Sequence, residues 1–168
     1  MHRRSWLKLG VAGAALLAVG GGTVALLEPG LRDGRLAGAG QTVFRHVARA
    51  VLDGTLPADQ EAQRQALDAL LVRVDHLVEA LPPHARQELS QLLALLNTVV
   101  GRRTLVGLEA PWAAASVGQL QGALQSMRIS SVALRQQAYH ALHDITAAAY
   151  FSDRSTWALL GYPGPQEI

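Results

Sequence analysis

Residues 59–81 read DQEAQRQALDALLVRVDHLVEAL, from Asp59 to Leu81, and they carry the clearest periodicity in the chain. The apolar side chains recur at intervals of three and four residues, which is the repeat of one helix face. They are Leu67, Leu70, Leu71, Val74, Leu77, Val78 and Leu81. Asp59 is suited to cap the helix at its start, and Pro82-Pro83 ends it. This stretch therefore predicts an amphipathic helix with one face against a core.

Similar repeats lie on both sides of this segment. They predict further helices at residues 41–52, 84–100, 113–127 and 131–150, and a short final turn at residues 153–160 with Ser155 as its candidate cap. Residues 101–111 read as a connector. No stretch alternates with the period of two that marks an exposed strand. We expect an all-α fold, a small bundle of about five helices preceded by an N-terminal signal or anchor helix.

The composition of the 168 residues agrees with this fold class. Hydrophobic residues make up 49% of the chain and aromatic residues only 5%, so small and aliphatic side chains predominate, which favours packed helices over a β-sandwich. The net charge of +2 is too small to suggest a nucleic-acid-binding surface. The absence of cysteine excludes disulfides, thiolate metal sites and a lipid-modified cysteine.

Residues 1–30 have the layout of an export signal. A basic start precedes an uncharged run from Leu9 to Leu27, and a polar break follows. The adjacent arginines, an apolar pair and a lysine resemble the twin-arginine consensus. The residues of this motif are Arg3, Arg4, Trp6, Leu7 and Lys8. The alternative is an ordinary secretory signal or membrane anchor with two arginines in its basic flank.

Two fates of this leader are compatible with the sequence. Ala37-Gly38-Ala39 offers a small-residue cleavage site within residues 31–40, which read as a linker. The run from Leu9 to Leu27 is also just long enough to span a bilayer as a helix, and the positive charge before it obeys the positive-inside rule. In both cases we expect the helical domain, residues 41–168, in the periplasm, either free or anchored to the cytoplasmic membrane.

The strongest candidate for chemistry is a group of polar side chains on the last long helix. His140 and Asp144 are four residues apart and share a face, and His143 lies beside them. Such a group offers metal ligands, but no third ligand or duplicated motif follows in the sequence. Histidines on a solvated helix face explain the same pattern. A metal-binding or enzymatic helical domain that uses these three residues therefore stays an alternative, and no catalytic residue is predicted.

The most distinctive stretch is the C-terminal tail, which gathers four aromatic residues in a chain poor in them. Tyrosine and tryptophan with one wet end are frequent interface anchors, and a Pro-rich tail loses little entropy on docking. Equally, the aromatic rings are suited to fold back as a lid on the bundle. The candidate partner-binding residues are Tyr150, Phe151, Asp153, Trp157, Gly161, Tyr162, Pro163 and Pro165.

This tail resembles the C-terminus of the gluconate 2-dehydrogenase subunit 3 family, with an aromatic pair, Ser-Asp, a later Trp157 and then Gly-Tyr-Pro-Gly-Pro. The segment 51–57, VLDGTLP, and Trp112 are similar to that family as well. Arg154 and Ser155 depart from its pattern. The resemblance spans most of the chain, but only the leader and the tail are specific.

The resemblance implies a non-catalytic small subunit. Its large partner would be an FAD-dependent oxidoreductase of the glucose–methanol–choline type that passes electrons to a cytochrome c subunit or a quinone, and this chain would hold no cofactor itself. Arg3 and Arg4 would address the complex to the twin-arginine translocase, which carries folded proteins. A free-standing anchored helical protein is a third hypothesis.

Overall fold

The computed structural model describes residues 27–162, apart from the side chains of Leu159 and Leu160. Helices dominate this part of the chain, so the prediction of an all-α fold is confirmed. The predicted signal helix lies outside the described residues. The elements are β1 (Leu31–Arg32), β2 (Arg35–Leu36), α2 (Gly38–Val51), α3 (Gln60–Glu79), α4 (Pro83–Asn97), α5 (Val99–Gly101), η2 (Arg102–Val106), η3 (Trp112–Ala114), α6 (Val117–Arg128), α7 (Ala133–Phe151) and η4 (Arg154–Leu160).

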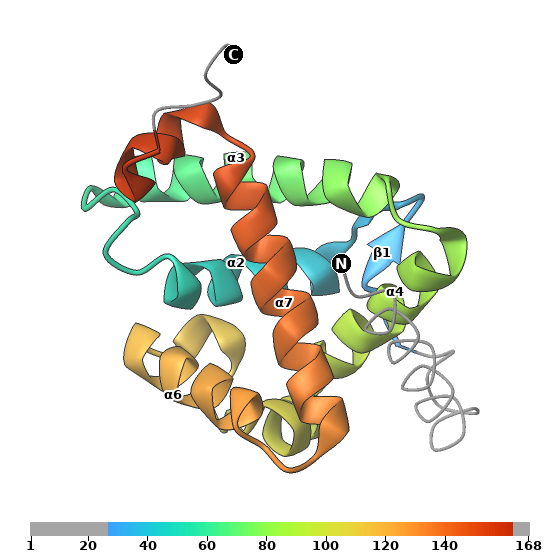
Figure 1. Ribbon diagram of the computed structural model, residues 1–168. Coiled ribbons are helices and arrows are strands. Elements are labelled where there is room, and N and C mark those ends of the chain that lie inside the picture. The colour runs from blue at the N-terminus through green and yellow to red at the C-terminus, as the bar shows by residue number, and fades with distance from the viewer. Residues whose placement is uncertain (1–26, 163–168) are drawn as a thin grey trace.

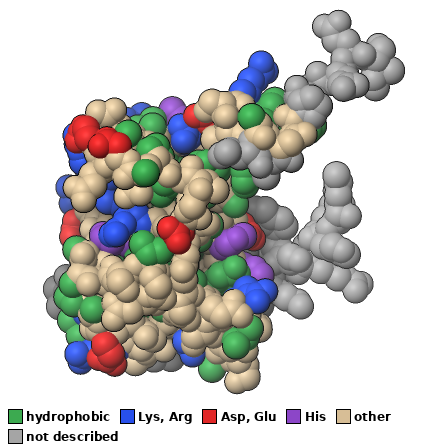
Figure 2. All heavy atoms as spheres, turned by 90° about the vertical axis from the view of Figure 1, so that its left-hand side faces the viewer, with side chains coloured by type: hydrophobic (Ala, Val, Ile, Leu, Met, Phe, Trp, Pro, Cys, Tyr) green, Lys and Arg blue, Asp and Glu red, His purple; other side chains and the backbone are tan. Residues whose placement is uncertain are grey.

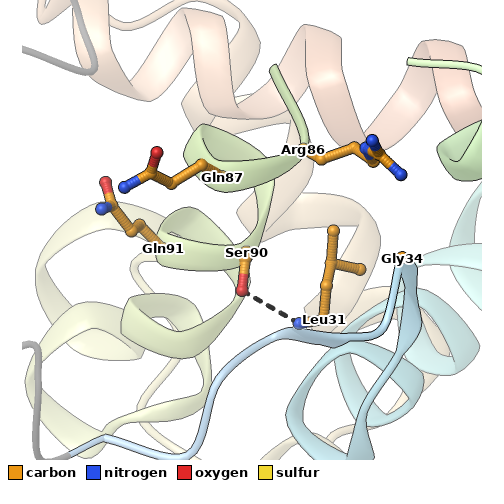
Figure 3. Close-up of a pocket in the computed structure, with 6 residues that line it drawn as sticks. All are labelled: Leu31, Gly34, Arg86, Gln87, Ser90 and Gln91. Atoms are coloured by element: carbon orange, nitrogen blue, oxygen red, sulfur yellow. Dashed lines mark hydrogen bonds between the residues drawn. The ribbon is translucent and has the colours of Figure 1, made fainter. Parts of the chain in front are cut away.

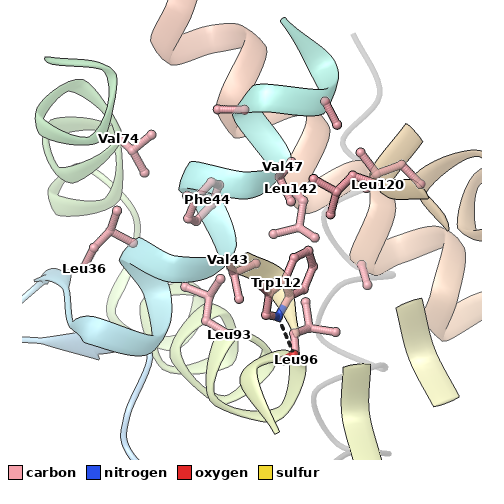
Figure 4. Packing of buried hydrophobic residues seen from close by; sticks show 14 of the residues in the cluster. Leu36, Val43, Phe44, Val47, Val74, Leu93, Leu96, Trp112, Leu120 and Leu142 are labelled. Carbon is pink, nitrogen blue, oxygen red and sulfur yellow. Dashed lines mark hydrogen bonds between the residues drawn. The ribbon is translucent and has the colours of Figure 1, made fainter. Parts of the chain in front are cut away.

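Helix α2 lies at the centre of the bundle, with α3, α4, α6 and α7 packed around it (Figure 1). Its side chains Val43, Phe44 and Val47 are completely buried. Figure 4 shows them among apolar side chains from the surrounding helices, including Leu93 of α4 and Leu142 of α7. The buried residues of α2 form one broad face, and small side chains such as Ala48 and Ala50 let the surrounding helices approach it, so α2 occupies the middle.

Helix α3 agrees with the helix predicted at residues 59–81. Asp59 caps the helix as expected, because its carboxylate accepts a hydrogen bond of 2.8 Å from the Ala62 amide. The predicted apolar face is confirmed, with five of its residues buried: Leu67, Leu70, Leu71, Val74 and Val78. Leu77 and Leu81 are only partly buried at the edge of the core. The helix ends before Pro82, as the two prolines dictate.

The segment before α2, which read as a linker, contains a β-hairpin. Asp33 and Gly34 both have positive φ, of 53° and 81°, as a tight two-residue hairpin turn requires. The strands pair antiparallel, and Leu31 and Leu36 are both buried in the core. With two residues each, the strands are too short to show an alternating pattern. The expected cleavage sequence Ala37-Gly38-Ala39 forms the start of α2.

Residues 101–111, predicted as a connector, begin with helical structure. Helix α5 continues directly into a π-helical turn, η2, which ends at Gly107 with a φ of +80°. Gly101 permits this arrangement, because a Cβ atom there would overlap the Leu95 carbonyl oxygen. The close approach of two backbones is a tertiary feature, and hydrophobic periodicity carries no signal for it.

Other predicted helix ends also differ. The helix predicted at residues 84–100 is interrupted at Thr98, whose extended backbone separates α4 from α5. Helix α6 begins at Val117, four residues later than expected, because Ser116 and Gln119 form a reciprocal capping box. Trp112 to Ala114 form a separate 3-10 turn, and the Trp112 indole donates a hydrogen bond of 3.0 Å to the Leu96 carbonyl. The final short helix is confirmed as η4, but its cap is Asp153 and the prediction of Ser155 was wrong.

Candidate partner-binding tail

The candidate tail leaves the bundle through a sharp turn between α7 and η4. The Asp153 carboxylate accepts hydrogen bonds from the Ser155 amide at 3.0 Å and from the Ser155 hydroxyl at 2.7 Å. These two bonds lower the pKa of Asp153, and the positive charge of Arg73 adds to the effect. The carboxylate is therefore ionised at neutral pH, and it fixes the direction in which η4 begins.

Arg73 of α3 connects this turn to the body of the protein. Its Nε donates a hydrogen bond of 2.9 Å to the Ala149 carbonyl at the end of α7. Its Nη1 lies 3.4 Å from an Asp153 carboxylate oxygen. One half-buried guanidinium thus holds both sides of the turn. Arg73 was not predicted as part of the tail, because the residues it binds are more than seventy positions away and no local pattern connects them.

The first aromatic pair of the tail lies largely inside. Tyr150 is buried, and its hydroxyl donates a long hydrogen bond of 3.4 Å to the Thr55 carbonyl in the α2–α3 connection. The ring of Phe151 meets that of Tyr150 edge-on at 5.2 Å and packs against the core. These contacts favour a structural role for Tyr150, whereas Phe151 keeps part of its surface exposed.

The second aromatic pair lies nearer the surface. The Trp157 indole donates a hydrogen bond of 2.8 Å to the Phe151 carbonyl, and the ring remains half-buried. The Arg154 guanidinium lies 5.7 Å from the centre of that ring. The centre of the Tyr162 ring is 5.4 Å from that of Trp157, and Tyr162 is 48% exposed. A tryptophan held in place by its polar edge, with aromatic surface left accessible, is suited to anchor a protein interface.

Helix η4 is attached at its start and ends at a glycine. Thr156 is buried, and its hydroxyl lies 3.2 Å from the Tyr150 carbonyl and 2.7 Å from the Asp153 carbonyl, so the first turn of η4 is attached to the end of α7. Gly161 ends η4 with a φ of +66°. Pro163 and Pro165 lie outside the described residues. Figure 2 shows the C-terminal region projecting from the main body, with hydrophobic and basic side chains on its surface.

The three polar residues of α7 lie on its outer side. His143 Nδ1 is 2.9 Å from an Asp144 carboxylate oxygen, while its ring stacks on Tyr139 at 5.3 Å. His140 is exposed, and its ring meets the Tyr139 ring edge-on with 5.3 Å between the ring centres. Within residues 27–162, no three His, Cys, Asp or Glu side chains are grouped to hold a metal ion. The structure therefore brings His143 and Asp144 together without a third ligand from the described chain.

A buried histidine elsewhere was not predicted. His46 of α2 donates from Nδ1 to the Thr42 carbonyl at 2.7 Å, and its ring lies 6.5 Å from that of Trp112. Burial lowers the pKa of His46, and the charges of Arg49 and Arg45 add to this in spite of the bond to Thr42. A neutral histidine in the core is a packing residue, since its ring is closed to solvent.

A shallow pocket of about 280 Å³ lies between the hairpin and α4 (Figure 3). Its lining residues are Leu31, Gly34, Arg86, Gln87, Ser90 and Gln91. The Ser90 hydroxyl accepts a hydrogen bond of 3.0 Å from the Leu31 amide, so it helps to hold the hairpin. Arg86 is the charged group of this lining, and no carboxylate or histidine accompanies it to make an acid–base pair.

The residues of the predicted export signal are not part of the described structure. Arg3, Arg4, Trp6, Leu7 and Lys8 lie outside the described residues. None of the helices within residues 27–162 has the length and apolar character needed to cross a membrane. Comparison of the chain with models of protein families, with curated proteins and with solved structures found no match.

Proposed function

We propose that this chain is the non-catalytic small subunit of a periplasmic FAD-dependent dehydrogenase of the glucose–methanol–choline type. The flavin and the substrate would lie in the large partner, and electrons would leave through a cytochrome c subunit or a quinone. The small subunit would bind the folded partner in the cytoplasm and carry it through the twin-arginine translocase. If its leader is retained, it would also attach the complex to the membrane.

The observation that carries this proposal is the organisation of the tail. Trp157 is held by a hydrogen bond to the Phe151 carbonyl, and Tyr162 lies against it with half of its surface exposed. Arg73 and Asp153 fix the turn beneath them. Because these groups are ordered before binding, docking would cost little conformational entropy. Aromatic anchors beside an arginine are the composition that interface hot spots favour.

The leader provides the second support. Arg3 and Arg4 precede an uncharged run, as in twin-arginine signals, and that pathway exports proteins that are already folded. A cofactor-bearing enzyme needs such a route, because its cofactor must be bound before export. A signal on a small helical subunit is explained if it serves a second polypeptide that has none.

The proposal is tested by changing the signal alone. In cells that carry Arg3→Lys with Arg4→Lys, we expect both this chain and the flavin enzyme to remain in the cytoplasm. The substitutions keep the positive charge of the leader, so a general secretory signal would continue to work. The variant Arg32→Lys with Arg35→Lys is the matched control, because it changes two arginines outside the motif. Normal export of the flavin enzyme in the Arg3, Arg4 variant would refute the proposal.

The metal-binding or enzymatic alternative, with His140, His143 and Asp144, predicts bound metal in the purified chain. That metal would be lost in His140→Ala. The contact between the His143 ring and the Asp144 carboxylate does not by itself favour this function, since it joins two neighbouring residues on the outer side of α7.

A further inference from the structure

One end of the bundle exposes a group of large aliphatic side chains. Val99 and Val100 of α5 are 54% and 68% exposed, and Ile129 and Val132 of the α6–α7 connection are 68% and 52% exposed. Figure 1 shows the α6–α7 connection in the lower part of the molecule, far from α3 and η4. Single exposed apolar residues are normal on a protein surface, whereas a group of them marks an interaction site.

The two segments that carry these side chains are joined by Arg135 of α7. Its Nε donates a hydrogen bond of 2.8 Å to the Leu105 carbonyl of η2, which directly follows α5. Its Nη2 donates 3.0 Å to the Ser126 hydroxyl near the end of α6. The exposed aliphatic residues therefore belong to one connected end of the bundle, which we name the α5–α6 end.

The charge of this end is positive. Between residues 98 and 135 the chain has four arginines, Arg102, Arg103, Arg128 and Arg135, and a single acidic residue, Glu109. Arg102 is buried and Arg135 donates to groups inside the domain, so Arg103 and Arg128 are the basic side chains that this end offers to solvent. Arg103 pairs with Glu109 at 2.8 Å, and Arg128 is exposed directly before Ile129. Basic side chains beside exposed aliphatic ones form the surface that binds at the interface of an anionic bilayer.

The first described residues of the chain lie along α4, the helix that α5 follows. Gly34 lies near Arg86 of α4, the Leu31 amide donates to the Ser90 hydroxyl, and the Gly30 amide donates to the Ser90 carbonyl. A Cβ atom on Gly30 would already meet Leu93. From Gly34 back to Gly30 the described chain thus advances along α4 toward the end that α5 continues, and the Glu28 carboxylate then lies beside Gly38 at the start of α2. A leader retained in the membrane would join the domain on this side.

We propose that the α5–α6 end rests on the surface of an anionic phospholipid bilayer. The exposed valines and Ile129 would enter the headgroup boundary, and the exposed Arg103 and Arg128 would pair with lipid phosphates. This inference rests on the retained leader of the proposed function. The opposite region, with η4 and the tail, would then face away from the membrane and stay accessible to the large subunit.

The chain contains no cysteine, so a single introduced cysteine carries a fluorescent label at one defined place. The experiment uses Val100→Cys and Ile129→Cys, each labelled with a polarity-sensitive dye, in the full-length chain. Val72→Cys is the matched control, because Val72 is a valine of α3 with a similar exposure of 55%. Each protein is reconstituted into vesicles of phosphatidylcholine with phosphatidylglycerol, some of which contain spin-labelled lipids as quenchers. Circular dichroism verifies that each variant is folded.

We expect the labels at positions 100 and 129 to shift to blue emission and to lose most of their fluorescence to the spin-labelled lipids. The label at position 72 should keep its emission in water, and the shifts should weaken in vesicles without phosphatidylglycerol. Equal water exposure at all three positions would overturn the inference. A blue shift of the labels at positions 100 and 129 in buffer without vesicles would also overturn it, because it indicates that a second copy of the chain covers this end. A blue shift that appears only when the flavin enzyme is added would overturn it as well.

These measurements involve no dehydrogenase. A negative vesicle result therefore does not change the outcome of the export experiment. If the flavin enzyme is not co-exported, the vesicle result is equally unaffected.

Discussion

Replacing Arg73 with alanine removes the connection between α3 and the tail. The side chain makes two contacts, a hydrogen bond of 2.9 Å to the Ala149 carbonyl and an ion pair of 3.4 Å with Asp153. Ala149 is completely buried, so its carbonyl loses a charged donor in a place that water reaches poorly. A hydrogen bond to a charged group contributes about 1.5–3 kcal/mol, and a partly exposed ion pair adds less than about 1 kcal/mol.

The Ala149 carbonyl keeps one other contact, because the Ser152 hydroxyl donates to it at 2.9 Å. We therefore take the lower part of the range and expect Arg73→Ala to reduce the free energy of unfolding by about 2 kcal/mol. Arg73→Lys should recover only part of this, since an ammonium group does not reach both acceptors with the geometry of a guanidinium.

The assay is urea unfolding followed by circular dichroism and by tryptophan fluorescence. Arg64→Ala is the matched control on the same helix, because Arg64 is exposed and pairs with Glu61 one turn away. Its loss should leave the free energy of unfolding nearly unchanged, because solvent screens an exposed ion pair. If Arg73→Ala is as stable as Arg64→Ala, and its tryptophan emission is unchanged, the reasoning about the turn is refuted.

Three further predictions concern the core and the helices. Gly101→Ala should destabilise the fold by about 2 kcal/mol or more in urea unfolding, because the new Cβ would overlap the Leu95 carbonyl oxygen; a neutral result would contradict the close packing of α5 on α4. Gly122→Ala, in the middle of α6 with nothing near the added methyl group, should instead raise the free energy of unfolding by about 0.5–1 kcal/mol, and a loss would show that α6 is not helical there. His46 is neutral in the core and its pKa is lowered by burial, so the unfolded chain binds the extra proton first. Wild type should therefore lose stability relative to His46→Gln as pH falls below about 6.5, the unfolded value, and show no such difference above it; equal pH dependence of both proteins would exclude a buried neutral His46.

The sequence predicted the long helices because each one presents a continuous apolar face. That face is what α3 uses against α2 and α7, and five of its predicted residues are buried. The hairpin and η2 were not predicted, since strands of two residues and a π-helical turn have no hydrophobic repeat. Local signals for two of the missed features were present and were not used: Asp33-Gly34 is a hairpin turn signal, and Ser116 with Gln119 marks the start of α6.

The candidate tail was identified from its residue types, which are rare in the rest of the chain. The division between its buried and accessible members depends on tertiary contacts. Tyr150 is inside because it reaches the Thr55 carbonyl, 95 residues earlier, and the tail turn depends on Arg73, 76 residues before Ala149. No pattern within a short window joins positions so far apart, so the sequence alone could not separate the anchor residues from the structural ones.

The most direct test of the small-subunit function is purification of the full chain, through an affinity tag, from membrane and periplasmic fractions. We predict that a flavin enzyme of the glucose–methanol–choline type co-purifies in a fixed ratio, with a flavin absorbance spectrum. Trp157→Ala with Tyr162→Ala should lose that enzyme, whereas Tyr139→Ala, which removes a half-buried aromatic ring of α7 outside the tail, should retain it. Recovery of this chain alone, without flavin from either fraction, would contradict the proposed function.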